Sequence, residues 1–177
     1  MKKIVLAIIV GIIPLVLPAA STDFWFRHFS VEDGLSSNSV RAIMQDKYGF
    51  MWLGTDDGLN RYDGTTIKVY NLNPQGSNDY ISSLYDTTDN IWIGTEDGVY
   101  IFDYETENFE PFKVLTAQGD SIKSNVNHIA EDRDGNLWFS TVGQGIFKYN
   151  ISKHYLEHYE FKDANGLMAS VLIDSEN

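Results

Sequence analysis

Short apolar runs separated by polar, turn-forming residues make up most of the chain after its first twenty residues. The runs are rich in β-branched and aromatic side chains, as in the stretches Val40 to Met44 and Thr66 to Tyr70. No stretch in this part of the sequence shows the spacing of apolar positions, about 3.6 residues, that an amphipathic helix needs. The hydrophobic pattern therefore predicts an all-β chain of short strands.

The runs recur as a unit centred on a tryptophan. Three segments align: VRAIMQDKYGFMWLGTDDGLNRYDG from Val40, ISSLYDTTDNIWIGTEDGVYIFDYE from Ile81 and VNHIAEDRDGNLWFSTVGQGIFKYN from Val126. Their tryptophans lie 40 and 46 residues apart, and each unit contains four strand-like runs separated by turns. Four antiparallel strands in a repeat of about 40 residues are typical of a β-propeller blade, whereas a sandwich or barrel gives no reason for the same residues to recur in phase.

The recurring residues have a structural interpretation. An aspartate six residues before each tryptophan is expected to cap the first turn, and a Gly-Thr pair after it lets a neighbouring backbone approach closely. The fixed phase of the tryptophans favours packing between blades over a platform for stacking sugars. The structural positions of the repeat are Asp46, Gly49, Trp52, Gly54, Thr55 and Gly58; Asp86, Trp92, Gly94, Thr95 and Gly98; and Asp132, Gly135, Trp138, Thr141 and Gly145. Ser140 replaces the glycine in the third copy.

The string GLSSNSVRAIMQDKYGFMWLGTDDGLNRYDG, from Gly34 to Gly64, resembles the two-component regulator propeller repeat. That pattern has Asn-x-Val before the first strand, Asp-x-x-Gly in the first turn and Trp-x-Gly-Thr in the second strand. The resemblance covers residues 24–177 and implies the periplasmic sensor region of a hybrid two-component histidine kinase. It further implies more blades, another β-domain, a membrane span, a kinase, a receiver and often a DNA-binding module elsewhere in the same chain.

The sequence thus predicts an all-β fold of four-stranded antiparallel β-propeller blades, about three blades plus the start of a fourth, in an open, incomplete ring. Because propellers close with typically 4 to 8 blades, we expect a fragment of a longer protein. Residues 24–29 resemble a last strand and are expected to belong to a closing blade that lies beyond Asn177. In a structure of this chain alone, we therefore expect them to be unpaired or wrongly paired. The expected bounds are 36–72 for blade 1, 78–114 for blade 2, 124–162 for blade 3 and 166–177 for the start of blade 4.

The N-terminus has the layout of a secretory signal peptide, expected over residues 1–20. Two lysines precede an apolar run from Ile4 to Leu17, and small residues follow. The run is shorter than the roughly 20 residues of a spanning helix, and Pro14 interrupts it, so a membrane anchor is the less favoured alternative. We therefore expect export to the periplasm, and the resemblance implies a full-length parent anchored in the inner membrane.

Composition limits the partners. The formal net charge of −12 repels phosphate backbones, so direct nucleic-acid binding by this segment is not expected. The chain has no cysteine, so packing alone must stabilise the exported domain. The expected partners are the remaining blades and downstream domains of the same chain, an oligosaccharide ligand, and a second copy in a homodimer of the full-length protein.

No catalytic residue, metal site or cofactor is expected. The three turn aspartates are spread one per blade, too far apart for a pair of glycosidase carboxylates. The stretch Asp132 to Asn136 lacks the distal glutamate of an EF-hand. The four histidines show no common zinc spacing, and although His154 and His158 are four residues apart, they are expected to face solvent on an outer strand. Connections between blades and those between second and third strands should share one face, where propellers usually bind ligands. The candidate ligand-binding residues there are Asn38, Arg41, Asp56, Asp79, Tyr80, Glu96, Asn127, His128 and Gln144.

The function that follows is ligand sensing by a periplasmic, non-catalytic propeller segment. Members of the family that it resembles commonly sense breakdown products of complex polysaccharides. Two alternatives remain open: an exported enzyme that acts on polysaccharide from a propeller scaffold, and a non-catalytic adhesion or assembly propeller.

Overall fold

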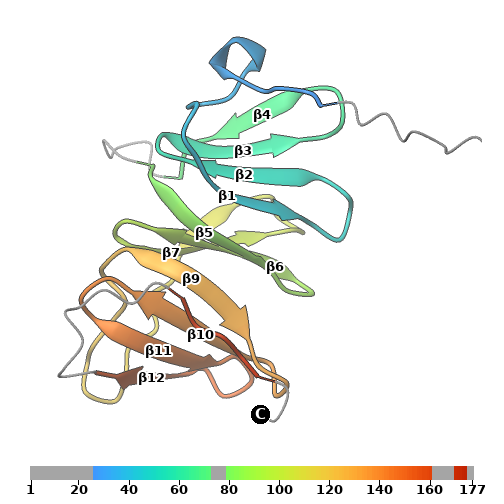
Figure 1. The fold of residues 1–177 in the computed structure, drawn as a ribbon. Helices are drawn as coiled ribbons and strands as arrows, with labels where there is room; N and C mark the ends of the chain where they lie inside the picture. The colour runs from blue at the N-terminus through green and yellow to red at the C-terminus, as the bar shows by residue number, and fades with distance from the viewer. Residues whose placement is uncertain (1–25, 73–78, 161–169, 175–177) are drawn as a thin grey trace, which may run out of the picture.

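The computed structural model describes residues 26–72, 79–160 and 170–174, which form three four-stranded antiparallel sheets (Figure 1). Blade 1 comprises β1 Val40–Gln45, β2 Met51–Thr55, β3 Gly58–Tyr62 and β4 Ile67–Tyr70. Blade 2 comprises β5 Ile81–Asp86, β6 Asn90–Thr95, β7 Gly98–Asp103 and β8 Phe109–Pro111. Blade 3 comprises β9 Val126–Glu131, β10 Asn136–Thr141, β11 Gly145–Asn150 and β12 Tyr155–Tyr159. A 3-10 turn, η1 Val31–Asp33, precedes blade 1.

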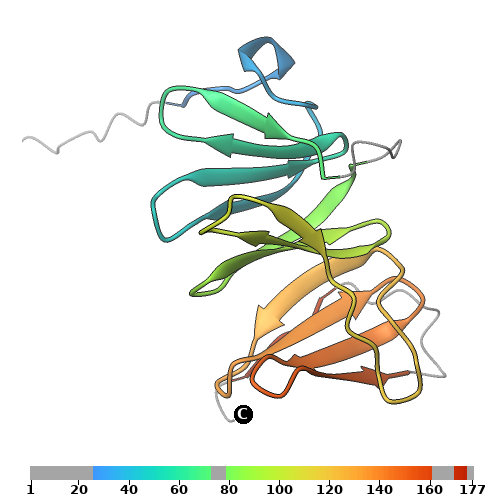
Figure 2. The same cartoon turned by 180° about the vertical axis from the view of Figure 1, so that it is seen from behind.

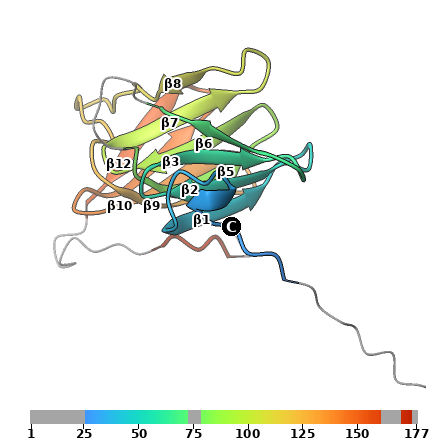
Figure 3. The same ribbon diagram turned by 90° about the horizontal axis from the view of Figure 1, so that it is seen from above.

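The strands of each sheet follow one another as a meander, in the order β1-β2-β3-β4 and its equivalents. The three sheets are stacked in chain order, from blade 1 at the top of Figure 1 to blade 3 at the bottom, and Figure 2 shows the same order from behind. The first strands β1, β5 and β9 contact one another in turn, so they form the inner edge of the stack, and the sheets overlie one another when seen from above (Figure 3). The predicted fold class, all-β with three propeller blades, is confirmed.

The core lies between the sheets. Trp52 packs between blades 1 and 2 in a buried cluster with Ile91, Ile93 and Phe102 of blade 2. Trp92 lies in a second cluster whose other members come mainly from blade 3, among them Leu137, Phe139 and Tyr149. Each of these tryptophans is therefore covered by the blade that follows it in the chain, as the packing interpretation of the repeat requires.

Close approach at the inner edge explains the glycine of the Gly-Thr pair. A Cβ atom added to Gly54 would lie 2.5 Å from Ile81 Cγ2, and one added to Gly94 would lie 2.7 Å from the carbonyl oxygen of Val126. Real side chains do not reach such distances without moving their neighbours. The glycines thus let the first strand of the next blade pack directly on the second strand of the previous one.

One repeat position departs from the sequence alignment. In blade 2, Asp86 pairs with Ile91, the residue before Trp92. The residues at the same position on the first strands of blades 1 and 3 are Gln45 and Glu131, which pair with Met51 and Leu137. The first turn of blade 2 is one residue shorter than the first turns of blades 1 and 3. In blade 2, therefore, a residue other than Asp86 occupies the turn position that Asp46 has in blade 1. The expectation that Asp86 is equivalent to the turn aspartates of blades 1 and 3 is therefore wrong.

Thr87 occupies that turn position, and a hydrogen bond is lost as a result. The other two blades share a bond from the indole Nε1 to the turn aspartate, 2.7 Å from Trp52 to Asp46 and 2.9 Å from Trp138 to Asp132. Trp92 Nε1 is buried and has no hydrogen-bond partner among the described residues. Asp86 instead links blades 1 and 2, because its carboxylate accepts from Lys47 N and from the Tyr104 hydroxyl.

The predictions for the two ends of the chain fall largely outside the described residues. Residues 1–20, the expected signal peptide, lie outside them altogether, and in the described part of the chain no helix is both long and apolar enough to cross a membrane. Residues 26–29 and 170–174 form no strand, so a closing-blade strand and a fourth blade stay predictions. Arg27 and Phe29 pack on blade 1, where Arg27 Nη1 donates to the Tyr62 hydroxyl at 2.9 Å.

Candidate functional site

The segments between blades and the turns between second and third strands meet at one end of the sheets, as expected from a meander. Backbone hydrogen bonds show this contact in blades 1 and 3. Asp56 N donates to Ser39 O at 3.1 Å, Gly58 N donates to Asp79 O at 3.0 Å, and Val142 N donates to Asn125 O at 2.8 Å. We call this end the loop face.

A β-bulge recurs where each first strand meets the loop face. The register shifts between Val40 and Ala42 in blade 1, and the same shift occurs in blades 2 and 3, so that Arg41, Ser82 and Asn127 are the extra residues. Bulges re-aim side chains and are frequent beside binding sites. The sequence analysis did not name Ser82 as a candidate. Alignment of the three repeats would have shown that Ser82 is equivalent to the candidates Arg41 and Asn127.

Three of the predicted residues come together at the junction of blades 1 and 2. Arg41 Nε donates to Asp56 Oδ1 at 2.6 Å and Arg41 Nη2 donates to Asp56 Oδ2 at 3.1 Å, so the pair is bidentate. The Arg41 guanidinium also lies 5.7 Å from the centre of the Tyr80 ring. The hydrogen bonds raise the pKa of Arg41 and lower the pKa of Asp56, so both groups stay charged over a wide pH range.

This cluster is accessible from solvent. The side chains of Arg41 and Asp56 are 49% and 33% exposed, and Tyr80 is half-buried. A planar ion pair that is held rigidly beside an aromatic ring presents both hydrogen-bonding groups and a stacking surface. The arrangement suits a small polar ligand with hydroxyl groups.

The structure does not bring the other predicted residues into this cluster. Asp79 is 8% exposed and accepts a hydrogen bond from Leu72 N, while the Gln144 side chain holds residues 121–124 by accepting from Lys123 N and donating to Ser121 O. Both side chains therefore support loops. Asn38 is exposed, and its Oδ1 accepts from Val31 N.

Glu96, Asn127 and His128 also lie away from the Arg41 cluster. Glu96 is exposed in the turn between β6 and β7, and Asn127 is the bulge residue of blade 3. His128 pairs with Ser140 across β9 and β10 and so faces the side of blade 3 that is turned away from blade 2. The nine candidates are thus spread over three blades.

The turn aspartates hold structure together. Asp46 is 5% exposed and accepts from two backbone N–H groups as well as from Trp52. Burial disfavours the ionised form of Asp132, but hydrogen bonds from Trp138 and Asn136 outweigh it and hold the pKa of Asp132 below its usual value. Within the described residues, no group of three His, Cys, Asp or Glu side chains is placed to bind a metal ion.

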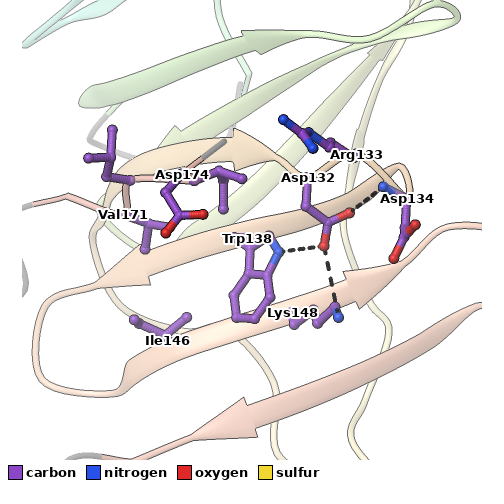
Figure 4. A pocket seen from close by; sticks show the side chains of 10 residues that line it. Asp132, Arg133, Asp134, Trp138, Ile146, Lys148, Val171 and Asp174 are labelled. Atoms are coloured by element: carbon purple, nitrogen blue, oxygen red, sulfur yellow. Dashed lines mark hydrogen bonds and ion pairs between the residues drawn. The ribbon is translucent and has the colours of Figure 1, made fainter. Parts of the chain in front are cut away.

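A cavity of about 420 Å³ lies beside Asp132 on the outer side of blade 3. Figure 4 shows the Asp132 carboxylate joined to both Trp138 and Lys148, with Val171 and Asp174 also lining the cavity. Lys148 Nζ lies 3.8 Å from Asp132 Oδ2 and 4.9 Å from the centre of the Trp138 ring. This surface belongs to a blade side, away from the loop face.

Comparison with known proteins agrees with the repeat. The profile of the two-component regulator propeller family matches residues 34–57 and 121–143. Histidine kinase P4 of Formosa agariphila is 46% identical over 70 residues, which are 40% of this chain and 5% of that protein.

Solved structures share the fold. The extracellular domain assigned to a hybrid two component system, BT3049 of B. thetaiotaomicron, aligns with a TM-score of 0.68 at 31% identity, over 81% of this chain and 21% of that one. The extracellular domain of BT4673, assigned to a one component system of the same organism, aligns with the same TM-score at 22% identity, over 81% of this chain and 20% of that one. The chain spans about a fifth of these structures and a twentieth of the curated relative. It therefore carries two-component regulator propeller repeats, folded as consecutive propeller blades.

Proposed function

We propose that this chain is a ligand-sensing segment of a two-component signalling protein. Support comes from the family match and from the likeness to extracellular domains of such systems. In this proposal the segment is exported to the periplasm, carries no catalytic residue itself, and belongs to a parent with further blades, an inner-membrane anchor and a histidine kinase. A ligand that prefers one of two arrangements of a parent homodimer would change the activity of the kinase.

The Arg41–Asp56–Tyr80 cluster is the observation that carries the choice of site. It is accessible, it lies on the loop face, and it combines an aromatic ring with a rigid pair of charged hydrogen-bonding groups. Pockets for polar ligands typically combine apolar surface with a few fixed polar groups of this kind. The β-bulge at Arg41 recurs in blades 2 and 3, and bulges are frequent beside binding sites.

The ligand class follows from charge. The guanidinium of Arg41 is already neutralised by Asp56, and the same turn adds the exposed acid Asp57. The corresponding turn of blade 2 carries two more exposed acids, Glu96 and Asp97. A ligand with several carboxylates or sulfates would be repelled by this surface. The proposed ligand is therefore a neutral oligosaccharide released from a complex polysaccharide.

Isothermal titration of the full chain with a panel of neutral oligosaccharides tests the site. Tyr80→Ala should weaken binding at least about tenfold, because it removes the stacking surface. Tyr48→Ala is the matched control, since Tyr48 is 63% exposed and belongs to the first turn of blade 1, at the opposite end of the sheet. Binding that is insensitive to Tyr80→Ala would reject the site, and no binding to any member of the panel would reject the ligand class.

A further inference from the structure

Arg61 carries a guanidinium group whose donors are not used by the fold. It lies on β3, toward the end of blade 1 opposite the loop face, and its side chain is 19% exposed. The guanidinium lies 4.7 Å from the centre of the Phe50 ring and 5.7 Å from the centres of the Trp52 and Tyr70 rings. Among the described residues, no group accepts a hydrogen bond from it, and the nearest carboxylate oxygen, Oε1 of Glu107, is 3.8 Å away. A largely buried guanidinium therefore keeps its N–H groups available.

The packing of blades does not require an arginine at this position. The equivalent residues of blades 2 and 3, each paired with the tryptophan of its own blade, are Ile101 and Lys148. Lys148 Nζ lies 3.8 Å from Asp132 Oδ2, the turn aspartate of the same blade. The carboxylate nearest to Arg61 comes instead from blade 2, from the turn between β7 and β8. The arginine is therefore a feature of this junction and not of the repeat.

A cavity of about 230 Å³, here the junction cavity, opens beside Arg61 between blades 1 and 2. Besides Arg61, its lining includes three aromatic rings and two acids: Phe50, Phe102, Tyr104, Asp46 and Glu107. Both blades that form its walls belong to the described stack, so the cavity is an internal feature of the chain. Pockets for drug-sized ligands measure about 300 to 1,000 Å³, so the junction cavity suits a molecule with a single ring.

Arg61 determines the charge of the ligand. A guanidinium binds a carboxylate through two parallel hydrogen bonds in its own plane, so an aromatic ring against its face does not compete. Glu107 holds the guanidinium loosely, because its side chain is 57% exposed and its oxygens lie 3.8 Å from Arg61 and 4.0 Å from Lys68 Nζ. A ligand carboxylate can therefore replace it. The acids Asp46 and Glu107 repel a dianion such as phosphate more strongly than a singly charged carboxylate.

The other polar groups of the lining are already used by the fold. The Tyr104 hydroxyl donates to Asp86 Oδ1 at 2.8 Å. The oxygens of Asp46 accept from two backbone N–H groups and from the Trp52 indole. A ligand with many hydroxyl groups would find few partners here, whereas an aromatic ring packs on other rings in offset or edge-on contacts. The lining thus favours an aromatic body.

We propose that the junction cavity binds a small aromatic monocarboxylate. Its carboxylate pairs with Arg61 in place of Glu107, and its ring contacts Phe50, Phe102 and Tyr104. Because the walls come from two blades, the bound ligand stabilises their junction. The cavity lies at the opposite end of the sheets from the Arg41–Asp56–Tyr80 cluster and takes a ligand of different charge. The proposal therefore stands whether or not the loop face binds a sugar.

Titration of the full chain with benzoate, followed by two-dimensional NMR of the indole N–H groups, tests the site. Trp52 is the reporter, because its Nε1 donates to Asp46 in the cavity wall and its ring lies 5.7 Å from the Arg61 guanidinium. Trp138 makes the same kind of hydrogen bond in blade 3, to Asp132, and serves as the internal control.

We expect benzoate to shift the Trp52 indole signal and not that of Trp138. A dissociation constant of about 1 mM is within the affinity that a ligand of this size can reach. Benzamide has the same ring without the charge, and inorganic phosphate has the charge without the ring. Both should bind at least about tenfold more weakly than benzoate.

Two variants should change benzoate binding in opposite directions. Arg61→Gln removes the partner of the carboxylate and should weaken binding at least about tenfold. Glu107→Gln removes the competing carboxylate and should strengthen binding about two- to fivefold, since an exposed ion pair contributes little. Glu110→Gln is the matched control, because Glu110 is exposed on β8, loses the same charge and does not line the junction cavity.

Circular dichroism first establishes that each variant is folded. Glu107→Gln keeps the test decisive even where Arg61→Gln does not fold, because the Glu107 side chain is largely exposed. Three results would overturn the proposal: no shift of the Trp52 signal at about 10 mM benzoate, equal binding of benzamide or phosphate, or a Glu107→Gln variant that binds benzoate no more tightly than Glu110→Gln.

Discussion

Replacement of Trp52 and of Trp92 by phenylalanine should have unequal costs, although both side chains are buried within a blade junction. Trp52 is 0% exposed and Trp92 is 4% exposed, and each contacts several aromatic rings of its junction. The loss of ring volume should therefore destabilise both variants by a similar amount, about 1 to 3 kcal/mol. The difference lies in the indole N–H, which donates to buried Asp46 at 2.7 Å only in blade 1.

A hydrogen bond to a charged group contributes about 1.5 to 3 kcal/mol. Trp52→Phe should thus lose roughly 2 kcal/mol more than Trp92→Phe, equivalent to about 4 to 8 °C in Tm for a chain of this size. Urea unfolding followed by far-ultraviolet circular dichroism measures both free energies of unfolding, with Asp46→Asn in each background as a check on the partner. Equal losses within about 0.5 kcal/mol would refute the assignment of the Asp46 bond as a stabilising contact.

Two further changes follow from the packing and from the pKa shifts. Gly54→Ala should lower the free energy of unfolding by about 1 to 3 kcal/mol, because the alanine Cβ would lie 2.5 Å from Ile81 Cγ2. A thermal melt unchanged from wild type would contradict the close approach of Ile81 to Gly54. Burial, with the charge of Glu131, raises the pKa of Tyr85 to about 12, above about 10 for an unfolded tyrosine. The unfolded chain therefore loses this proton first, and stability should fall as pH rises from about 10 to 12. The urea midpoint of Tyr85→Phe should fall less steeply over that range than the midpoint of the wild type. Identical slopes would contradict the raised pKa of the half-buried Tyr85 hydroxyl.

The repeat carried most of the fold information. A tryptophan, a Gly-Thr pair and turn residues in fixed phase were enough to predict four-stranded blades, because each position meets the same neighbours in every copy. The repeat alignment gave the wrong position for Asp86. The first turn of blade 2 is one residue shorter than those of blades 1 and 3, so Asp86 lies on strand β5 and not in the turn. Counting residues back from Trp92 could not reveal this, since a shortened turn and a shortened strand look alike in sequence.

The candidate site was predicted less well. The meander placed Arg41, Asp56 and Tyr80 on one face, but their meeting depends on a bulge that re-aims Arg41, and bulges leave a weak trace in a single sequence. Gln144 and Asp79 look like ligand-binding residues because they are polar and lie in loops. The structure shows instead that their side chains hydrogen-bond to neighbouring backbone groups. Such local bonds depend on loop conformation, which the repeat does not specify.

Hydrogen exchange at the indole N–H groups, followed by two-dimensional NMR, tests most directly the claim that each tryptophan side is covered by the next blade. The account predicts slow exchange for Trp52 and for Trp92, which blades 2 and 3 cover, and faster exchange for Trp138, which no sheet of the described residues covers. It also predicts a hydrogen-bonded chemical shift for Trp52 but not for Trp92. Equal exchange rates for Trp52 and Trp138, or rapid exchange at Trp92, would contradict it.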